Sequence, residues 1–198
     1  MKNLPPRDIG PIQGVVLAGG LSTRMGTDKR FLKTAGTTWV DRAIRRLAAA
    51  LRTAPSDIII SGALEGYRSV PDLKPGMGPL GGVISSLQHL ERTPHRWVLF
   101  TPVDMPLLSI TALRTLIGAA EQEPVRGAQV IRYAGSELPF LLRNSGRARA
   151  IAEGIRRGKS VSLALWRFQR ALELKTIDPA GLFPPETFFN ANSPGDIP

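Results

Sequence analysis

The chain has 198 residues, 42% of them hydrophobic, with two histidines and no cysteine. The lack of cysteine excludes disulfides, cysteine nucleophiles and iron–sulfur ligation. A formal net charge of +10, from 26 Lys and Arg against 16 Asp and Glu, suits anionic partners such as nucleotides. The arginines are spread over several predicted helices without a nucleic-acid-binding motif, so we interpret the charge as a solvated surface rather than a nucleic-acid site.

The length predicts a single domain over residues 1–198, with residues 1–11 as a flexible lead-in. No apolar run reaches the roughly 18 residues that a membrane span requires. The first residues also lack the apolar core of a signal peptide. We therefore expect a cytoplasmic protein with no membrane partner.

Apolar runs alternate with helical stripes along the chain. The pattern predicts strands at 12–18, 57–61, 67–70, 97–101, 128–132, 138–142 and 170–177. It predicts helices at 38–51, 80–90, 109–121, 147–157 and 161–168. This alternation indicates an α/β domain with a mostly parallel sheet, in which ligands bind beyond the carboxyl ends of the strands.

The loop after the first strand holds the densest chemistry, and from Leu17 to Lys29 it reads LAGGLSTRMGTDK. Neither the Walker pattern nor the dinucleotide pattern G-x-G-x-x-G fits its spacing. Gly19 and Gly20 let backbone amides approach an anion. A charge at about 4 Å contributes about 4 kcal/mol, against about 1 kcal/mol for an amide nest. We therefore predict that Arg24 and Lys29 stabilise a triphosphate and a departing pyrophosphate.

The strand predicted at 97–101 leads into a lone carboxylate, Asp104, held between Pro102 and Pro106. The two prolines fix the backbone, which places Asp104 at the exit of the strand. Mg²⁺ commonly takes one or two carboxylates and completes its shell with phosphates and water. A single carboxylate is more often a turn cap, but its pairing with the first loop favours a magnesium ligand.

A glycine-rich segment opens the helix predicted at 80–90. Gly78 comes directly before a proline at the helix start and serves local geometry. Gly81 and Gly82 in the first turn each cost about 1 kcal/mol relative to alanine. This cost indicates either the close approach of a sugar or base or close packing of the helix on the sheet. Asp72, just upstream, is a candidate acceptor for ribose or base hydrogen bonds.

Near the carboxyl end, Asn190 and Asn192 are two residues apart, so an extended chain would point both amides the same way. They either contact a ligand or cap the final turn, and the residues alone do not decide between these. His89 and His95 are expected at the surface.

Together these segments resemble the molybdenum cofactor guanylyltransferases, within the broader group of MobA-like nucleotidyltransferases. The likeness extends from Gly14 to Pro194. Its motifs are L-A-G-G-x-S-x-R-M-G-x-D-K at Leu17–Lys29, G-P-L-x-G at Gly78–Gly82, P-x-D-M-P at Pro102–Pro106 and N-x-N-[TS]-P at Asn190–Pro194. The resemblance implies a Rossmann-like three-layer α/β/α nucleotidyltransferase fold with a mostly parallel sheet.

The resemblance also implies a reaction, in which the terminal phosphate of molybdopterin attacks the α-phosphorus of Mg-GTP and pyrophosphate leaves. The implied catalytic residues are Arg24, Lys29 and Asp104. The implied nucleotide contacts are Leu17, Ala18, Gly19, Gly20, Lys29, Ser61, Asp72, Gly78 and Asp104. Mg²⁺ is assigned to Asp104 and the acceptor to Asn190 and Asn192. Ser61 departs from the asparagine frequent in the family, which leaves its nucleotide contact open.

The implied partners are GTP, molybdopterin or the molybdenum cofactor, and proteins of cofactor biosynthesis or molybdoenzyme chaperones. A cytidylyltransferase acting on the same cofactor typically reads L-A-A-G, so Gly19 favours guanylyl transfer. A sugar-1-phosphate nucleotidyltransferase usually carries additions for which this length leaves little room. A nucleotide-binding regulator without turnover is a further alternative, and the presence of Arg24, Lys29 and Asp104 argues against it.

Overall fold

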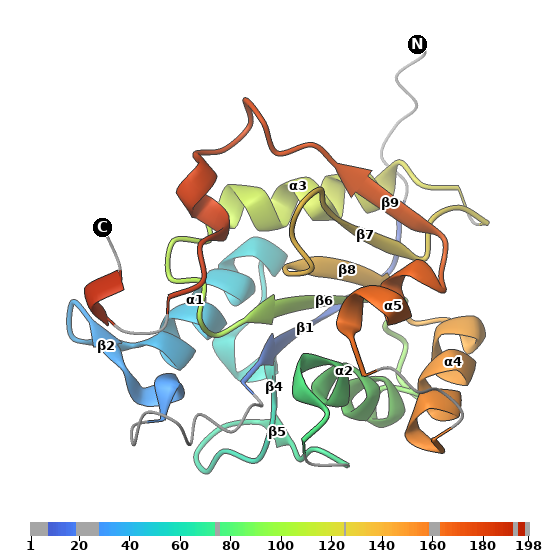
Figure 1. Cartoon of the computed structure of the whole chain (residues 1–198), viewed down its shortest axis with the longest axis horizontal. Coiled ribbons are helices and arrows are strands. Elements are labelled where there is room, and N and C mark those ends of the chain that lie inside the picture. The colour runs from blue at the N-terminus through green and yellow to red at the C-terminus, as the bar shows by residue number, and fades with distance from the viewer. Residues whose placement is uncertain are drawn as a thin grey trace.

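The computed structural model describes residues 8–18, 28–73, 76–124, 126–158, 163–191 and 194–196. Within these residues the main sheet has seven strands in the order β5-β4-β1-β6-β8-β7-β9 (Figure 1). Its strands are β1 (Ile12–Leu17), β4 (Ile59–Ser61), β5 (Ser69–Val70), β6 (Trp97–Pro102), β7 (Val130–Tyr133), β8 (Phe140–Arg143) and β9 (Leu174–Ile177). A separate two-stranded hairpin consists of β2 (Lys33–Thr34) and β3 (Thr37–Thr38).

Helices follow most of these strands. The α-helices are α1 (Trp39–Leu51), α2 (Gly78–His89), α3 (Ile110–Glu121), α4 (Gly146–Arg156) and α5 (Leu165–Arg170). Single 3-10 turns are η2 (Lys29–Phe31), η3 (Pro55–Asp57), η4 (Pro185–Phe188) and η5 (Pro194–Asp196). In the part of the chain that is described, no helix has the length and apolarity needed to cross a membrane.

Alternating side chains of each strand build two separate cores, one on each face of the sheet. In β1, Val16 packs with α1 and α3, whereas Val15 and Leu17 pack with α2. In β6, Leu99 joins the first core and Phe100 the second. The expected three-layer α/β/α fold is therefore confirmed, with α1 and α3 on one face and α2, α4 and α5 on the other (Figure 1).

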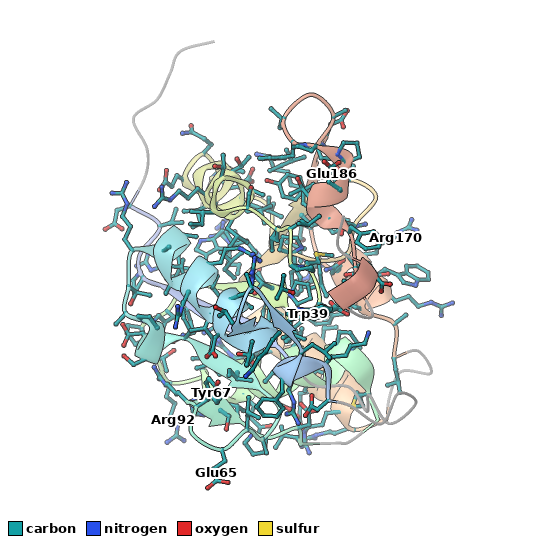
Figure 2. All side chains as sticks on the ribbon, turned by 90° about the vertical axis from the view of Figure 1, so that its left-hand side faces the viewer. Trp39, Glu65, Tyr67, Arg92, Arg170 and Glu186 are labelled. Atoms are coloured by element: carbon teal, nitrogen blue, oxygen red, sulfur yellow. The ribbon has the colours of Figure 1, made fainter. Side chains whose placement is uncertain are left out.

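The strand directions place most loops of interest at one edge of the sheet. β1 pairs in parallel with β4 and β6, β5 is parallel to β4, and β9 is parallel to β7. β8 runs antiparallel to both β6 and β7. We call the edge where β1, β4 and β6 end the carboxyl edge. Figure 2 looks onto this side, with Trp39 near the middle, Tyr67 below it and Glu186 above it.

Local sequence signals explain the starts of α1 and α3. The Thr38 hydroxyl accepts the Asp41 backbone N–H at 3.2 Å and caps α1, which agrees with the predicted start of this helix at residue 38. The Ser109 hydroxyl caps α3 in the same way. The strand predicted at 57–61 is shorter, because Pro55 opens a 3-10 turn that includes Asp57. The Asp57 carboxylate accepts hydrogen bonds from the Thr53 hydroxyl and the Ala54 N–H just before that turn.

The other predicted elements are found with shifted ends. The strand predicted at 170–177 begins only at Leu174, because α5 continues to Arg170. The β2–β3 hairpin was not predicted. Its turn has Ala35 and Gly36 at positive φ, so the signal was a short Ala-Gly pair between polar residues rather than an apolar alternation.

Candidate active site

The backbone at the end of β1 is hydrogen-bonded on one side to the end of β4 and on the other side to the loop after β6. Leu17 O accepts the Val103 N–H at 3.3 Å, and the Ala18 N–H donates to Ser61 O at 3.3 Å. Leu17 and Ala18 are both buried. The loops that follow β4 and β6 are thus fixed relative to the residue from which the glycine-rich loop leaves.

Lys29 is positioned by its neighbour Asp28. The Asp28 carboxylate caps the 3-10 turn η2 and accepts the Arg30 guanidinium Nε–H at 2.8 and 2.9 Å. Hydrogen bonding from the Arg30 side chain holds the pKa of Asp28 below its ordinary value. Arg30 also donates to Ala63 O at 3.1 Å, in the loop after β4. The hydrogen bonds between Asp28 and Arg30 were missed from the sequence, where Arg24 and Lys29 were the charged residues singled out in this loop.

Lys29 and Asp104 meet at the carboxyl edge. The Lys29 ammonium lies 3.9 Å from the Asp104 carboxylate, and both side chains are partly exposed, at 22% and 29%. This distance is about 1 Å longer than a charge-assisted hydrogen bond. Burial raises the pKa of the Asp104 carboxyl above its ordinary value, and the nearby Lys29 ammonium opposes that rise. A cation and an anion therefore face the same partly open space.

A second polar pair lies where β4 and β5 end. Ser61 Oγ donates to Asp72 Oδ1 at 3.4 Å, and the Ser61 side chain is fully buried. Burial raises the pKa of Asp72 above its ordinary value, and the Ser61 hydrogen bond only partly counteracts this. A partly buried carboxylate whose hydrogen bond to Ser61 is long is suited to accept hydrogen bonds from a ligand.

Asp72→Asn is expected to increase stability at pH 7. Because the folded-state pKa of Asp72 is raised, its ionised form destabilises the native state above that pKa, and this penalty disappears as the pH falls through it. Thermal unfolding from pH 3 to pH 7 checks the sign. The Tm advantage of the asparagine variant should shrink toward low pH. A constant difference would contradict the burial effect.

Gly82 allows α2 to pack directly onto the sheet. A Cβ at this position would lie 2.1 Å from Ser61 Oγ and 3.0 Å from both Ser61 Cβ and Leu17 Cδ2. Of the two explanations for this glycine, the structure therefore supports close packing of helix on sheet. Gly78, one turn earlier, has φ +59° with open space around it, so its requirement is conformational.

Gly82→Ala is expected to destabilise the fold by about 1–3 kcal/mol through overpacking. The Ser61 hydroxyl must also rotate away, which breaks its bond to Asp72. Gly154→Ala in α4 is the matched control, since its Cβ would enter open space. There the change should stabilise by about 0.5–1 kcal/mol. Denaturant unfolding compares the two, and equal effects would contradict the packing account.

The carboxyl-terminal segment around Ala191 packs beside Asp104, the candidate magnesium ligand. The Ala191 backbone N–H donates to Asp104 O at 2.9 Å, and the Ala191 side chain is fully buried. This bond places the exposed Asn190 immediately beside the Asp104 loop. The proximity of the asparagine motif to Asp104 could not be deduced from spacing.

Several predicted site residues lie outside the described residues: Gly19, Gly20, Arg24 and Asn192. The same holds for residues 1–7 of the expected lead-in. The remaining candidates fall into two groups. Lys29, Asp104 and Asn190 lie around the end of β6, whereas Ser61, Asp72 and Gly78 lie around the ends of β4 and β5. Leu17 and Ala18 connect the groups.

Comparison with known proteins gives the same relationship along nearly the whole chain. Residues 14–172 match the MobA-like NTP transferase domain. A molybdenum cofactor guanylyltransferase of Xanthomonas euvesicatoria pv. vesicatoria is 30% identical over 185 residues, covering 93% of this chain and 91% of the relative. A probable one of Pelotomaculum thermopropionicum is 32% identical over 192 residues, covering 93% and 89%.

The fold has a counterpart among solved structures. Molybdopterin-guanine dinucleotide biosynthesis protein A from Archaeoglobus fulgidus superposes with a TM-score of 0.69 at 19% identity, covering 93% of this chain and 94% of that one. Fold, motif order and sequence identity agree, and the resemblance noted from the motifs is confirmed: the chain belongs to the MobA-like NTP transferase family.

Proposed function

We propose that this protein is a molybdenum cofactor guanylyltransferase that transfers GMP from GTP to the terminal phosphate of molybdopterin. An oxygen of that phosphate attacks the α-phosphorus of GTP, the bond between the α-phosphorus and its bridging oxygen breaks, and pyrophosphate leaves. The observation that carries the proposal is the meeting of Lys29 and Asp104, 3.9 Å apart, at the carboxyl edge. The relatives at 30% and 32% identity support the choice of donor and acceptor.

Different residues are assigned to the leaving group, the nucleoside and the acceptor according to their chemistry. The Lys29 ammonium is a compact charge suited to the leaving pyrophosphate, and Arg24 is assigned the same anion. Leu17, Ala18 and the pair Ser61–Asp72 are assigned to the nucleoside, because the Ala18 N–H bonds to Ser61 O and the Ser61 hydroxyl bonds to Asp72, which joins them at the ends of β1 and β4. Asn190 and Asn192 are assigned to the acceptor, supported by the hydrogen bond from Ala191 to Asp104 O.

The donor set around Asp104 fits a magnesium ion. Among the described residues no group of three or more histidine or acidic side chains is placed to hold a metal. Asp104 supplies one hard, partly exposed carboxylate, and Mg²⁺ is commonly held by one or two carboxylates together with substrate phosphates and water. When bound, the ion would neutralise charge developing on the phosphates. Asp104 would be its protein ligand, oriented by the backbone contacts of residues 103 and 104.

The proposal also implies where the protein works and with what. GTP is abundant in the cytoplasm, so we place the enzyme there. Its product is consumed by molybdoenzymes, so cofactor-biosynthesis proteins and molybdoenzyme chaperones are the protein partners we propose.

Pyrophosphate release tests the donor and the acceptor separately. The protein is incubated with Mg²⁺, purified molybdopterin or molybdenum cofactor, and each of the four NTPs in turn. We expect release with GTP only in the presence of the acceptor, together with a product whose mass increases by one GMP. Faster release with CTP would reassign the donor. Release from GTP with a sugar phosphate but not with molybdopterin would reassign the acceptor.

A further inference from the structure

Arg46 of α1 holds the loop that carries Asp104. Its guanidinium donates from Nη1 to Met105 O at 3.1 Å and from Nη2 to Pro106 O at 2.6 Å. These two carbonyls belong to the residues directly after Asp104. One side chain from a helix almost 60 positions earlier therefore binds two successive peptide groups of the loop.

Pro106 has no backbone N–H, so it can take part in backbone hydrogen bonding only through its carbonyl oxygen. Two further hydrogen bonds reach carbonyl oxygens of this loop, from the Leu108 N–H to Met105 O at 3.2 Å and from the Ala191 N–H to Asp104 O at 2.9 Å. Met105 and Leu108 are buried, at 3% and 2% exposure. The backbone on the carboxyl side of Asp104 is thus fixed mainly by donors reaching its carbonyl oxygens.

Arg46 is suited to this role by its planar fork, which binds two acceptors with fixed geometry. Burial, together with the nearby Arg42, lowers the pKa of Arg46 to about 10, so its guanidinium remains charged and fully protonated at neutral pH. Its two hydrogen bonds go to neutral carbonyls rather than to an acid. The Arg46 guanidinium therefore stabilises the backbone of the Asp104 loop.

We infer that Arg46 is a positioning residue, which sets the location of the Asp104 carboxylate by binding the carbonyls of Met105 and Pro106. This inference rests on the proposed function, in which Asp104 is the magnesium ligand. Misplacement of a reacting group by about 1 Å can cost about 100-fold in rate. Loss of the fork is accordingly expected to affect catalysis without removing any group that touches substrate.

Two variants and one control separate positioning from general stability. Arg46→Met removes the fork, and Arg46→Lys keeps a charge but offers a single donor group. The control is Arg114→Met in α3, because Arg114 likewise donates to a carbonyl, Ala49 O at 2.9 Å, within the α1–α3 contact away from the Asp104 loop. All three are compared at a temperature where circular dichroism shows them folded.

Hydrogen exchange of the protein without substrate or metal gives the first measurement. The amides of Leu108 and Ala191, which donate to Met105 O and Asp104 O, should exchange at least about 10-fold faster in Arg46→Met than in wild type. The exchange rates of these amides in Arg46→Lys should lie between those of wild type and Arg46→Met, and the rates in Arg114→Met should match wild type. Unchanged exchange at both amides in Arg46→Met would overturn the inference.

Kinetics gives the second measurement. Arg46→Met should lower kcat by about 10- to 100-fold and raise the Mg²⁺ concentration for half-maximal rate, with the KM for GTP changed less than threefold. If Arg46 only stabilised the fold, its variants would have a lower Tm but the same Mg²⁺ concentration for half-maximal rate as wild type, and the inference would be overturned. If wild type itself releases no pyrophosphate, the proposed function fails, and the exchange measurement still decides the role of Arg46.

Discussion

Asp104→Ala is expected to lower turnover of GTP by about 100-fold or more, while the sheet stays folded. The Asp104 carboxylate lies 3.9 Å from the Lys29 ammonium at the carboxyl edge. Its removal takes away the protein ligand proposed for Mg²⁺ and with it the electrostatic stabilisation of the reacting phosphates, an effect of this size for one preorganised group. Steady-state pyrophosphate release as a function of Mg²⁺ measures it.

The free energy of unfolding of Asp104→Ala should equal or exceed that of wild type, because burial disfavours the ionised Asp104 carboxylate in the folded protein. Glu91→Ala is the charge-matched control, an exposed acid after the end of α2. It should retain wild-type turnover and Mg²⁺ dependence. Near-normal GTP consumption by Asp104→Ala would refute the metal assignment.

Lys29→Met is expected to lower kcat by about 100-fold through the leaving group. A lysine about 4 Å from pyrophosphate oxygens contributes about 4 kcal/mol at an effective dielectric constant of about 20, part of which water replaces when the lysine is lost. Methionine keeps the length of the side chain without its charge. Rapid-quench measurement of a single turnover isolates this chemical step from product release.

The control for Lys29 is Lys175→Met, because Lys175 also pairs with a carboxylate, that of Glu123, but on the edge strand β9. It should leave the single-turnover rate unchanged. Equal losses in the two variants would indicate a general effect of net charge and would contradict a specific role for Lys29.

The sequence predicted that Asp104 pairs with the loop that holds Lys29, because both segments follow buried strands. Parallel neighbours end at the same edge, and β1 and β6 pair in parallel from Ile12 to Leu17. Apolar runs and helical stripes also predicted α1, β1 and β6 closely, since these elements depend on local periodicity. The adjacency of β1 and β6 was not predicted; the structure shows it, and with it the 3.9 Å distance between the two side chains.

The contacts that hold the site could not be predicted in the same way. Arg46 reaches the Asp104 loop from a helix whose pattern marks it only as a polar position. The bond from Ala191 to Asp104 O joins segments far apart in the chain through backbone atoms, which carry no residue-specific signal. Gly82 was compatible with a ligand or with packing, and only the distance to Ser61 distinguishes these.

The most direct test of the account is the crystal structure of the protein with Mn²⁺ and a non-hydrolysable GTP analogue. Anomalous scattering locates the metal independently of the nucleotide. We predict one metal about 2 Å from an Asp104 oxygen, bound to the phosphates, with the Lys29 ammonium directed at the β- and γ-phosphates. A nucleotide bound elsewhere, or a metal without Asp104 among its ligands, would contradict the proposal.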